Sequence, residues 1–157
     1  MKRNKLVCTA LLILLSLWGA NAQGYNTNRT ALSNFLTRMY NNAPFEGVRI
    51  VKDYDKSYII SVLELDNSKY LSESVRDRVA GVKAMAQVSK FINGSRITQD
   101  LIINTSESSD GNTKTDVTEE IREYSIGLVK SLELLTSFPK DSTHQVFIYI
   151  KEIDKES

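Results

Sequence analysis

The stretch KYLSESVRDRVAGVKAMAQVSKFIN, residues 69–93, predicts the longest helix of the chain, and the rest of the fold is arranged around it. Apolar or small side chains recur in it at steps of three and four residues, which is the spacing of one helix face. The recurring residues are Val75, Val79, Val82, Met85 or Ala86, Ser89 and Ile92. We therefore expect an amphipathic helix whose apolar stripe packs on a sheet. Part of its surface carries only small residues, which let a partner backbone approach closely. These residues are Ala80, Gly81, Ala84 and Ala86.

Strands are predicted on both sides of this helix. Before it, residues 45–52 and 58–65 are rich in β-branched side chains, and the short polar link between them is typical of a hairpin. After it, residues 95–104, 125–138 and 145–153 read as further strands, although a helical interpretation of residues 127–135 stays open.

Two short helices complete the expected elements. One covers residues 30–40 and ends before Pro44, after an irregular polar segment at residues 23–29. The other starts near Asp116, where acidic and hydroxyl residues have capping character. The order of elements predicts an α+β fold, in which a mainly antiparallel sheet of about five strands carries the long amphipathic helix and the shorter helices on one face.

The first residues have the three-part layout of a secretory signal peptide. A basic start is followed by an almost unbroken apolar run over residues 6–18, and small residues at Ala20 and Ala22 precede a cut before Gln23. The run is shorter than the roughly 20 residues that span a bilayer. Cys8, the only cysteine, lies near the start of the apolar run instead of after its end, which disfavours a lipid anchor. We expect cleavage near Ala22 and a periplasmic or extracellular, cell-surface location, with membrane association left open.

The expected organisation is a signal peptide at residues 1–22, a polar segment with a short helix at 23–44, and a single domain at 45–157. Cleavage would leave 135 of the 157 residues, with a formal charge near −2, because the leader carries three of the positive charges in a chain of net charge +1. Without a basic excess, nucleic acid is a poor partner. Without cysteine, the remaining chain has no disulfide, thiolate nucleophile or thiolate zinc site. An exported domain without disulfides fits a Gram-negative bacterial envelope.

Catalytic and metal-binding motifs are not evident in the sequence. His144 is the only histidine, and one imidazole cannot supply both a ligand set and the base of a triad. Asp53 and Asp55 alternate as calcium ligands do, but the rest of a calcium loop is missing around them. We therefore assign no catalytic, cofactor-binding or metal-binding residue and expect a protein that is not an enzyme.

Aromatic side chains on the predicted sheet suggest a recognition surface. Alternation along the last strand places Phe147 and Tyr149 on the opposite face from Val146 and Ile148. If helices cover one sheet face, the other still presents apolar or aromatic groups to a partner. We therefore predict an interaction surface containing Phe147, Tyr149 and Tyr58.

Several segments together resemble a known family. These are residues 78–87, the run Phe91-Ile92-Asn93-Gly94-Ser95-Arg96-Ile97, the run Tyr124-Ser125-Ile126-Gly127-Leu128-Val129, and residues 146–150. Over residues 75–153 the chain resembles the LPP20-like lipoproteins and the related N-terminal domain of the flagellar T protein. Those families have an Ala-rich helix, a Gly-bounded strand, a Ser-x-Gly-hydrophobic step and a closing strand. The resemblance implies a small, non-enzymatic envelope domain that works in assembly or surface association. This chain departs from the family in lacking a lipobox and in adding an N-terminal helix and hairpin.

The expected function is that of an exported envelope binding or structural module, which acts through another envelope protein or through self-association and needs no cofactor. One alternative is a small secreted hydrolase or lyase that uses carboxylates such as Glu64, Asp100 or Glu123. A pocket that joins two of these would favour it. Another is a secreted inhibitor or ligand-binding domain. A deep apolar cavity between the long helix and the sheet would favour ligand binding, and a protruding ordered loop would favour inhibition.

Overall fold

The computed structural model describes residues 20–94, 101–105 and 129–153, with side chains from residue 28 onward. The chain divides into two compact units, residues 1–42 and residues 43–157. Within the first unit, α2 (Ala20–Asn42) is a continuous helix of 23 residues. Residues 1–19, which hold most of the predicted signal peptide, lie outside the described part.

The irregular segment expected at residues 23–29 is helical instead, and the short helix expected at residues 30–40 is the second half of α2. The physical reason is that no proline interrupts the chain before Pro44, so that nothing blocks the helix from continuing toward Ala20. Leu32, Leu36 and Tyr40 are spaced four residues apart and therefore share one face of α2.

The second unit contains a sheet with the strand order β3-β1-β2-β5-β4. Its strands are β1 (Gly47–Asp53), β2 (Lys56–Asp66), β3 (Ile102–Asn104), β4 (Glu133–Pro139) and β5 (His144–Ile153). The pairs β1–β2, β2–β5 and β4–β5 are antiparallel, whereas β1 and β3 are parallel. The α+β class with five strands is therefore confirmed, and the sheet is mixed. The parallel pair is possible because both β2 and α3 lie between β1 and β3 in the chain, and parallel strands need a long connection that a tight turn cannot provide.

The predicted first hairpin is present. Asp53 lies opposite Lys56, which leaves Tyr54 and Asp55 as a two-residue turn. Tyr54 has a φ of 55°, the left-handed conformation that tight hairpin turns require at their centre. The chain enters β1 through Gly47, whose φ of 107° is one that residues with a Cβ rarely adopt.

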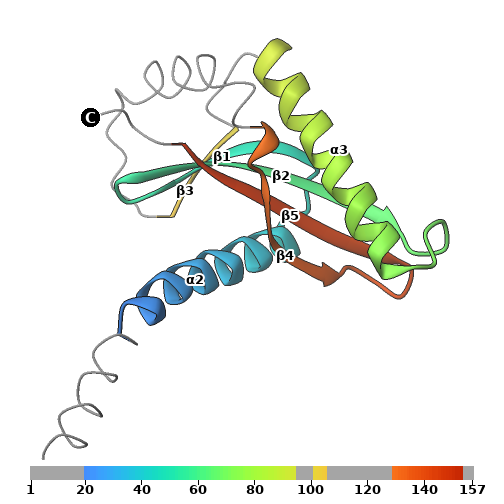
Figure 1. Cartoon of the computed structure of the whole chain (residues 1–157), viewed down its shortest axis with the longest axis horizontal. Coiled ribbons are helices and arrows are strands. Elements are labelled where there is room, and N and C mark those ends of the chain that lie inside the picture. Colours follow the sequence, from blue (N-terminus) through green and yellow to red (C-terminus); the bar gives the residue numbers. More distant parts are fainter. Residues whose placement is uncertain (1–19, 95–100, 106–128, 154–157) are drawn as a thin grey trace, which may run out of the picture. The chain divides into compact units, whose positions relative to one another are not determined.

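The long helix is α3 (Glu73–Gly94), and Figure 1 shows it beside the sheet. It begins after Ser72, whose carbonyl oxygen accepts hydrogen bonds from the backbone N–H groups of Val75 (3.1 Å) and Arg76 (3.0 Å). The side chains that it buries are Ala80, Ala84, Val88, Phe91 and Ile92.

The apolar stripe predicted for this helix is wrong at Val75 and Val82, which are 37% and 58% exposed, whereas Val79 is partly buried and packs against the core. Close packing explains the difference, because the alanines let the helix backbone come near the strands beneath it. Small residues for close approach were expected, and two of them, Ala80 and Ala84, are fully buried.

The core beneath α3 has two parts. Near the C-terminal half of α3, Val88, Phe91 and Ile92 pack with Val48 and Ile50 of β1, Ile59 of β2 and Ile153 of β5. Near its N-terminal half, Ala80 and Ala84 pack with Leu63, Leu65, Phe147 and Tyr149. A polar contact also joins α3 to β2, since the fully buried Ser61 hydroxyl donates a hydrogen bond to Gln87 Oε1 at 2.6 Å.

The remaining sequence predictions have mixed outcomes. The last two strands pair as an antiparallel hairpin, with an irregularity between Leu134 and Thr136. Residues 125–128 of the strand expected at residues 125–138 lie outside the described residues, and the described strand begins at Glu133. Residues 129–130 are helical, so the helical alternative for residues 127–135 agrees with the structure at these two residues but not at residues 133–135. Residues 95–100 of the third predicted strand and the short helix predicted from Asp116 lie outside the described residues.

Candidate functional site

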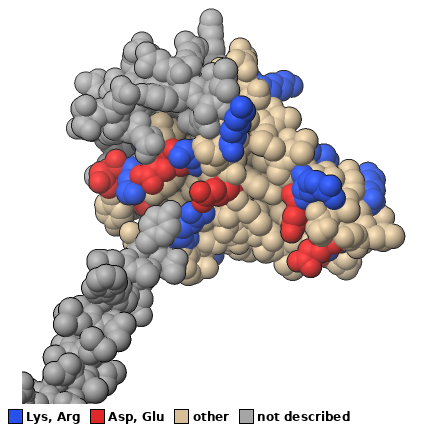
Figure 2. Space-filling model, viewed as in Figure 1, with Lys and Arg blue, Asp and Glu red and all other residues tan. Residues whose placement is uncertain are grey.

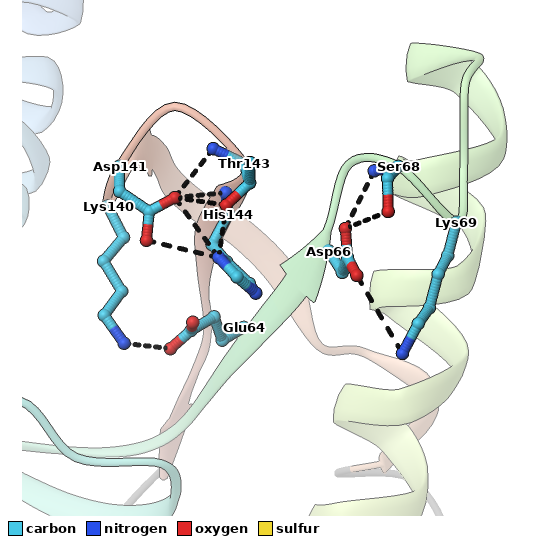
Figure 3. A network of polar contacts seen from close by, with 8 residues as sticks. All are labelled: Glu64, Asp66, Ser68, Lys69, Lys140, Asp141, Thr143 and His144. Atoms are coloured by element: carbon cyan, nitrogen blue, oxygen red, sulfur yellow. Dashed lines mark hydrogen bonds and ion pairs between the residues drawn. The ribbon is translucent and has the colours of Figure 1, made fainter.

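Polar side chains gather where β2 ends and where β4 turns into β5 (Figure 3). We call this group the sheet-end cluster: Glu64, Asp66, Ser68, Lys69, Lys140, Asp141, Thr143 and His144. The register of the sheet creates it, because Asp66 at the end of β2 lies opposite His144 at the start of β5. The backbone N–H of Asn67 also donates to the carbonyl oxygen of Thr143 at 2.7 Å, which ties the two turns together.

Asp141 organises the β4–β5 turn. Its Oδ1 accepts hydrogen bonds from the backbone N–H groups of Thr143 (2.7 Å) and His144 (2.8 Å) and from the Thr143 hydroxyl (2.8 Å). Bonds of this kind favour the ionised carboxylate, so the backbone and hydroxyl of Thr143 hold the pKa of Asp141 well below its usual value. This is the local pattern by which aspartate stabilises a turn.

His144 is held by the same turn and is not arranged as a proton relay. Its Nδ1 lies 2.9 Å from the Thr143 hydroxyl and 3.2 Å from each carboxylate oxygen of Asp141. In a catalytic triad the acid and the nucleophile contact different ring nitrogens, so that a proton can cross the imidazole. Here both groups approach one nitrogen, and the arrangement fixes the ring within its turn.

The other acidic residues of the cluster are also engaged. Glu64 Oε2 lies 2.7 Å from Lys140 Nζ, which links the middle of the sheet to the β4–β5 turn. Asp66 Oδ1 accepts hydrogen bonds from the hydroxyl (2.6 Å) and the backbone N–H (2.9 Å) of Ser68, and these bonds lower the pKa of Asp66. The cluster therefore supplies hydrogen-bond acceptors for its turns.

The carboxylates considered for hydrolysis are not brought together in the described part of the chain. Glu64 belongs to the sheet-end cluster, whereas Asp100 and Glu123 lie outside the described residues. Asp53 accepts a hydrogen bond from the Thr105 hydroxyl, which joins the end of β1 to the residue after β3. Over residues 20–94, 101–105 and 129–153, no three His, Cys, Asp or Glu side chains gather as metal ligands would.

The predicted aromatic surface is not exposed in this structure. Phe147 and Tyr149 are 0% and 7% exposed and lie under α3. The Tyr149 hydroxyl donates to the carbonyl oxygen of Asp77 at 3.1 Å, and burial raises the pKa of this tyrosine. Tyr58 is half-buried and, by strand alternation, lies on the opposite face of β2 from Ile59. The three rings therefore do not form one surface, because the face expected to stay open is the face that α3 covers.

The exposed apolar groups lie elsewhere, on the outward side of α3. We call the exposed residues on this side the outer α3 surface: Val75, Arg78, Val82, Lys83, Ala86 and Lys90. Val75 and Val82 are separated by two helical turns, and Ala86 follows one turn later, so they form a stripe along the helix. From their periodicity, Val75 and Val82, with Met85 or Ala86, were expected in the apolar stripe that packs on the sheet. The signal that could have identified them is the second, smaller stripe of Ala80 and Ala84.

Cations flank this stripe. Of the four basic residues in α3, Arg76 donates to the carbonyl oxygens of Tyr70 (2.9 Å) and Leu71 (3.3 Å), which holds it at the start of the helix. The other three are the exposed Arg78, Lys83 and Lys90. Figure 2 shows lysine and arginine side chains along the side of the molecule where α3 lies in Figure 1.

No helix among the described residues combines the length and the hydropathy needed to cross a membrane. Comparison of the chain with models of known protein families, with curated proteins and with solved structures finds no match.

Proposed function

We propose that this chain is an exported, non-catalytic module of a bacterial cell envelope that works by protein–protein association. The observation that carries the proposal is the outer α3 surface, where branched apolar side chains remain exposed on a regular helix. Val82 is 58% exposed, and Leu71 in the loop before the helix is 88% exposed. Apolar groups gathered on one face, with charged groups at their edge, are typical of a surface that meets a partner.

The polar groups of the second unit support a binding role over a catalytic one. In the sheet-end cluster, Asp141 and Asp66 accept hydrogen bonds from their own turns, and Glu64 pairs with Lys140. A general acid or base needs a pKa near the working pH, whereas the pKa values of Asp66 and Asp141 are lowered. These groups are better suited to holding the turns at the end of a rigid scaffold.

Export and family resemblance complete the proposal. The basic start, the apolar run and the small residues before Gln23 favour secretion with cleavage near Ala22. The resemblance of residues 75–153 to the LPP20-like and flagellar T N-terminal domains is consistent with a role in envelope assembly. In this proposal the long amphipathic helix closes one face of the sheet and presents its other side to the partner.

The test is to express the full chain with a C-terminal affinity tag, isolate it from the envelope fraction and measure its mass by light scattering after size exclusion. We expect a complex or an oligomer that the exposed substitution Val82→Asp dissociates. The matched control is Lys130→Glu, an exposed change outside α3 that should leave the complex intact. Recovery of a strictly monomeric protein with no specific companion would contradict the proposal.

A further inference from the structure

The charges on α3 are arranged by side. Its only acidic residues, Glu73 and Asp77, each lie seven residues before a buried alanine, Ala80 and Ala84 respectively. Because seven residues are close to two helical turns, both acids share the side of the helix that carries the buried alanines, although both are exposed. The outward side therefore carries an apolar stripe and basic residues but no acidic residue.

The basic residues lie along both edges of the stripe. Arg78 follows Val75 by three residues and borders one edge, whereas Lys83 and Lys90 are two turns apart and border the other edge. In the described part of the chain, no ion pair involves any of these three cations. The surface thus has a positive rim that its own described surroundings do not neutralise.

A second copy of this helix would be a poor occupant. In a parallel pair of helices, Arg78 of one copy would approach Lys83 of the other, since residues five apart on opposite edges meet in such pairs. In an antiparallel pair the same edges would meet, and lysine would face lysine. Like charges placed together across an interface disfavour that partner.

The shape of the stripe indicates what kind of surface fits it. Valine and alanine are small, and Ser89 continues the stripe about two turns after Val82 and one turn after Ala86, so a second helix can approach closely. Helices that lie in a bilayer surface instead use bulky Trp, Phe or Leu side chains on their apolar face. The outer α3 surface offers none of these within its stripe.

We propose that the outer α3 surface binds an amphipathic helix of a partner protein whose apolar stripe is bordered by acidic residues. The inference rests on the proposed function and specifies its site and the chemistry of its partner. Apolar contacts along Val75, Val82 and Ala86 provide the buried strip, and Arg78, Lys83 and Lys90 attract the acidic borders of the partner.

The probe is a fluorescent helical peptide of about three heptads, with leucine on its apolar stripe and glutamate on both borders. Its control has glutamine in place of glutamate. We expect the full chain to bind the acidic peptide in fluorescence anisotropy, more weakly as salt rises. The double change Arg78→Glu/Lys83→Glu should weaken binding by about tenfold or more, while Lys130→Glu should not. Circular dichroism of each variant checks that the fold is retained.

Equal binding of both peptides, or equal binding by the charge-reversed variant, would overturn the inference. The inference would also be overturned if the full chain bound phosphatidylglycerol vesicles but not the acidic peptide, and if the double variant lost the vesicle binding. The surface would then be a membrane contact.

Photo-crosslinking in cells separates this inference from the proposed function. A photoreactive amino acid at position 82 should give a protein adduct. Adducts from position 54, where the native tyrosine is 86% exposed, but none from position 82 would overturn the inference alone. The absence of adducts from both positions would count against the proposed function as well.

Discussion

The hydrogen bond between Ser61 and Gln87 provides a sharp test of how α3 sits on the sheet. Ser61 is fully buried in β2, and its hydroxyl has the Gln87 side chain of α3 as an acceptor at 2.6 Å. Ser61→Ala removes the donor, and the half-buried Gln87 can turn toward water, so we expect a loss of about 1 kcal/mol in the free energy of unfolding. Gln87→Leu leaves a buried hydroxyl without its acceptor, which costs about 1–3 kcal/mol.

The two changes should not be additive. In the double variant no polar group is left buried without a partner, so we expect its loss to fall short of the sum by about 1 kcal/mol. Urea denaturation followed by circular dichroism measures all four proteins, and Ser74→Ala, an exposed serine of α3, is the matched control. Additive losses, within about 0.3 kcal/mol, would refute the reasoning because the contact would then contribute no coupling.

Two further predictions concern backbone conformation and acid stability. At Gly81 a Cβ would meet only the Tyr149 side chain, 3.5 Å away. Gly81→Ala should therefore leave the free energy of unfolding unchanged or raise it by about 0.5–1 kcal/mol. At Gly47 a Cβ would meet no other atom, but the φ of +107° is one that residues with a Cβ rarely adopt. Gly47→Ala should therefore lower the free energy of unfolding by about 1–2 kcal/mol, and the reverse order of melting temperatures would contradict both assignments. The pKa of Asp141 is lowered on folding from an ordinary value of 3.8, so its contribution is present above about pH 4 and is lost as the pH falls. The stability difference between the native chain and Asp141→Asn should therefore shrink on acidification, and a difference that stays constant from pH 7 to pH 3 would show that this carboxylate is not stabilised by the turn.

Local sequence signals predicted much of the second unit. The β-branched runs of β1 and β2 and the polar link around Tyr54 were sufficient for the first hairpin, because strand and turn preferences act over a few residues. The alternating residues of β5 were equally informative. By contrast, the parallel pairing of β3 with β1 joins residues about fifty positions apart, and no local preference encodes such a contact.

The orientation of α3 could not be predicted for a different reason. Its sequence contains two stripes, one of valines and one of alanines that continues through Val88, and hydrophobicity alone favours the valines. Packing reverses this preference, because Ala80 and Ala84 allow the helix to lie close over Phe147 and Tyr149. This preference missed Val82 as a surface residue. A separate assumption, that the helices would cover the opposite face of β5, placed those two aromatic rings on an exposed face.

The central claim is that α3 faces the sheet with the side that carries Ala80 and Ala84 and faces solvent with the side that carries Val75 and Val82. The most direct measurement is the free energy of unfolding of the matched variants Ala84→Asp and Val82→Asp. Ala84 is fully buried, so a carboxylate there should cost more than about 4 kcal/mol or prevent folding. At the exposed Val82 the same change should cost less than about 1 kcal/mol. A chain that tolerates aspartate at position 84 and unfolds with aspartate at position 82 would contradict the claim.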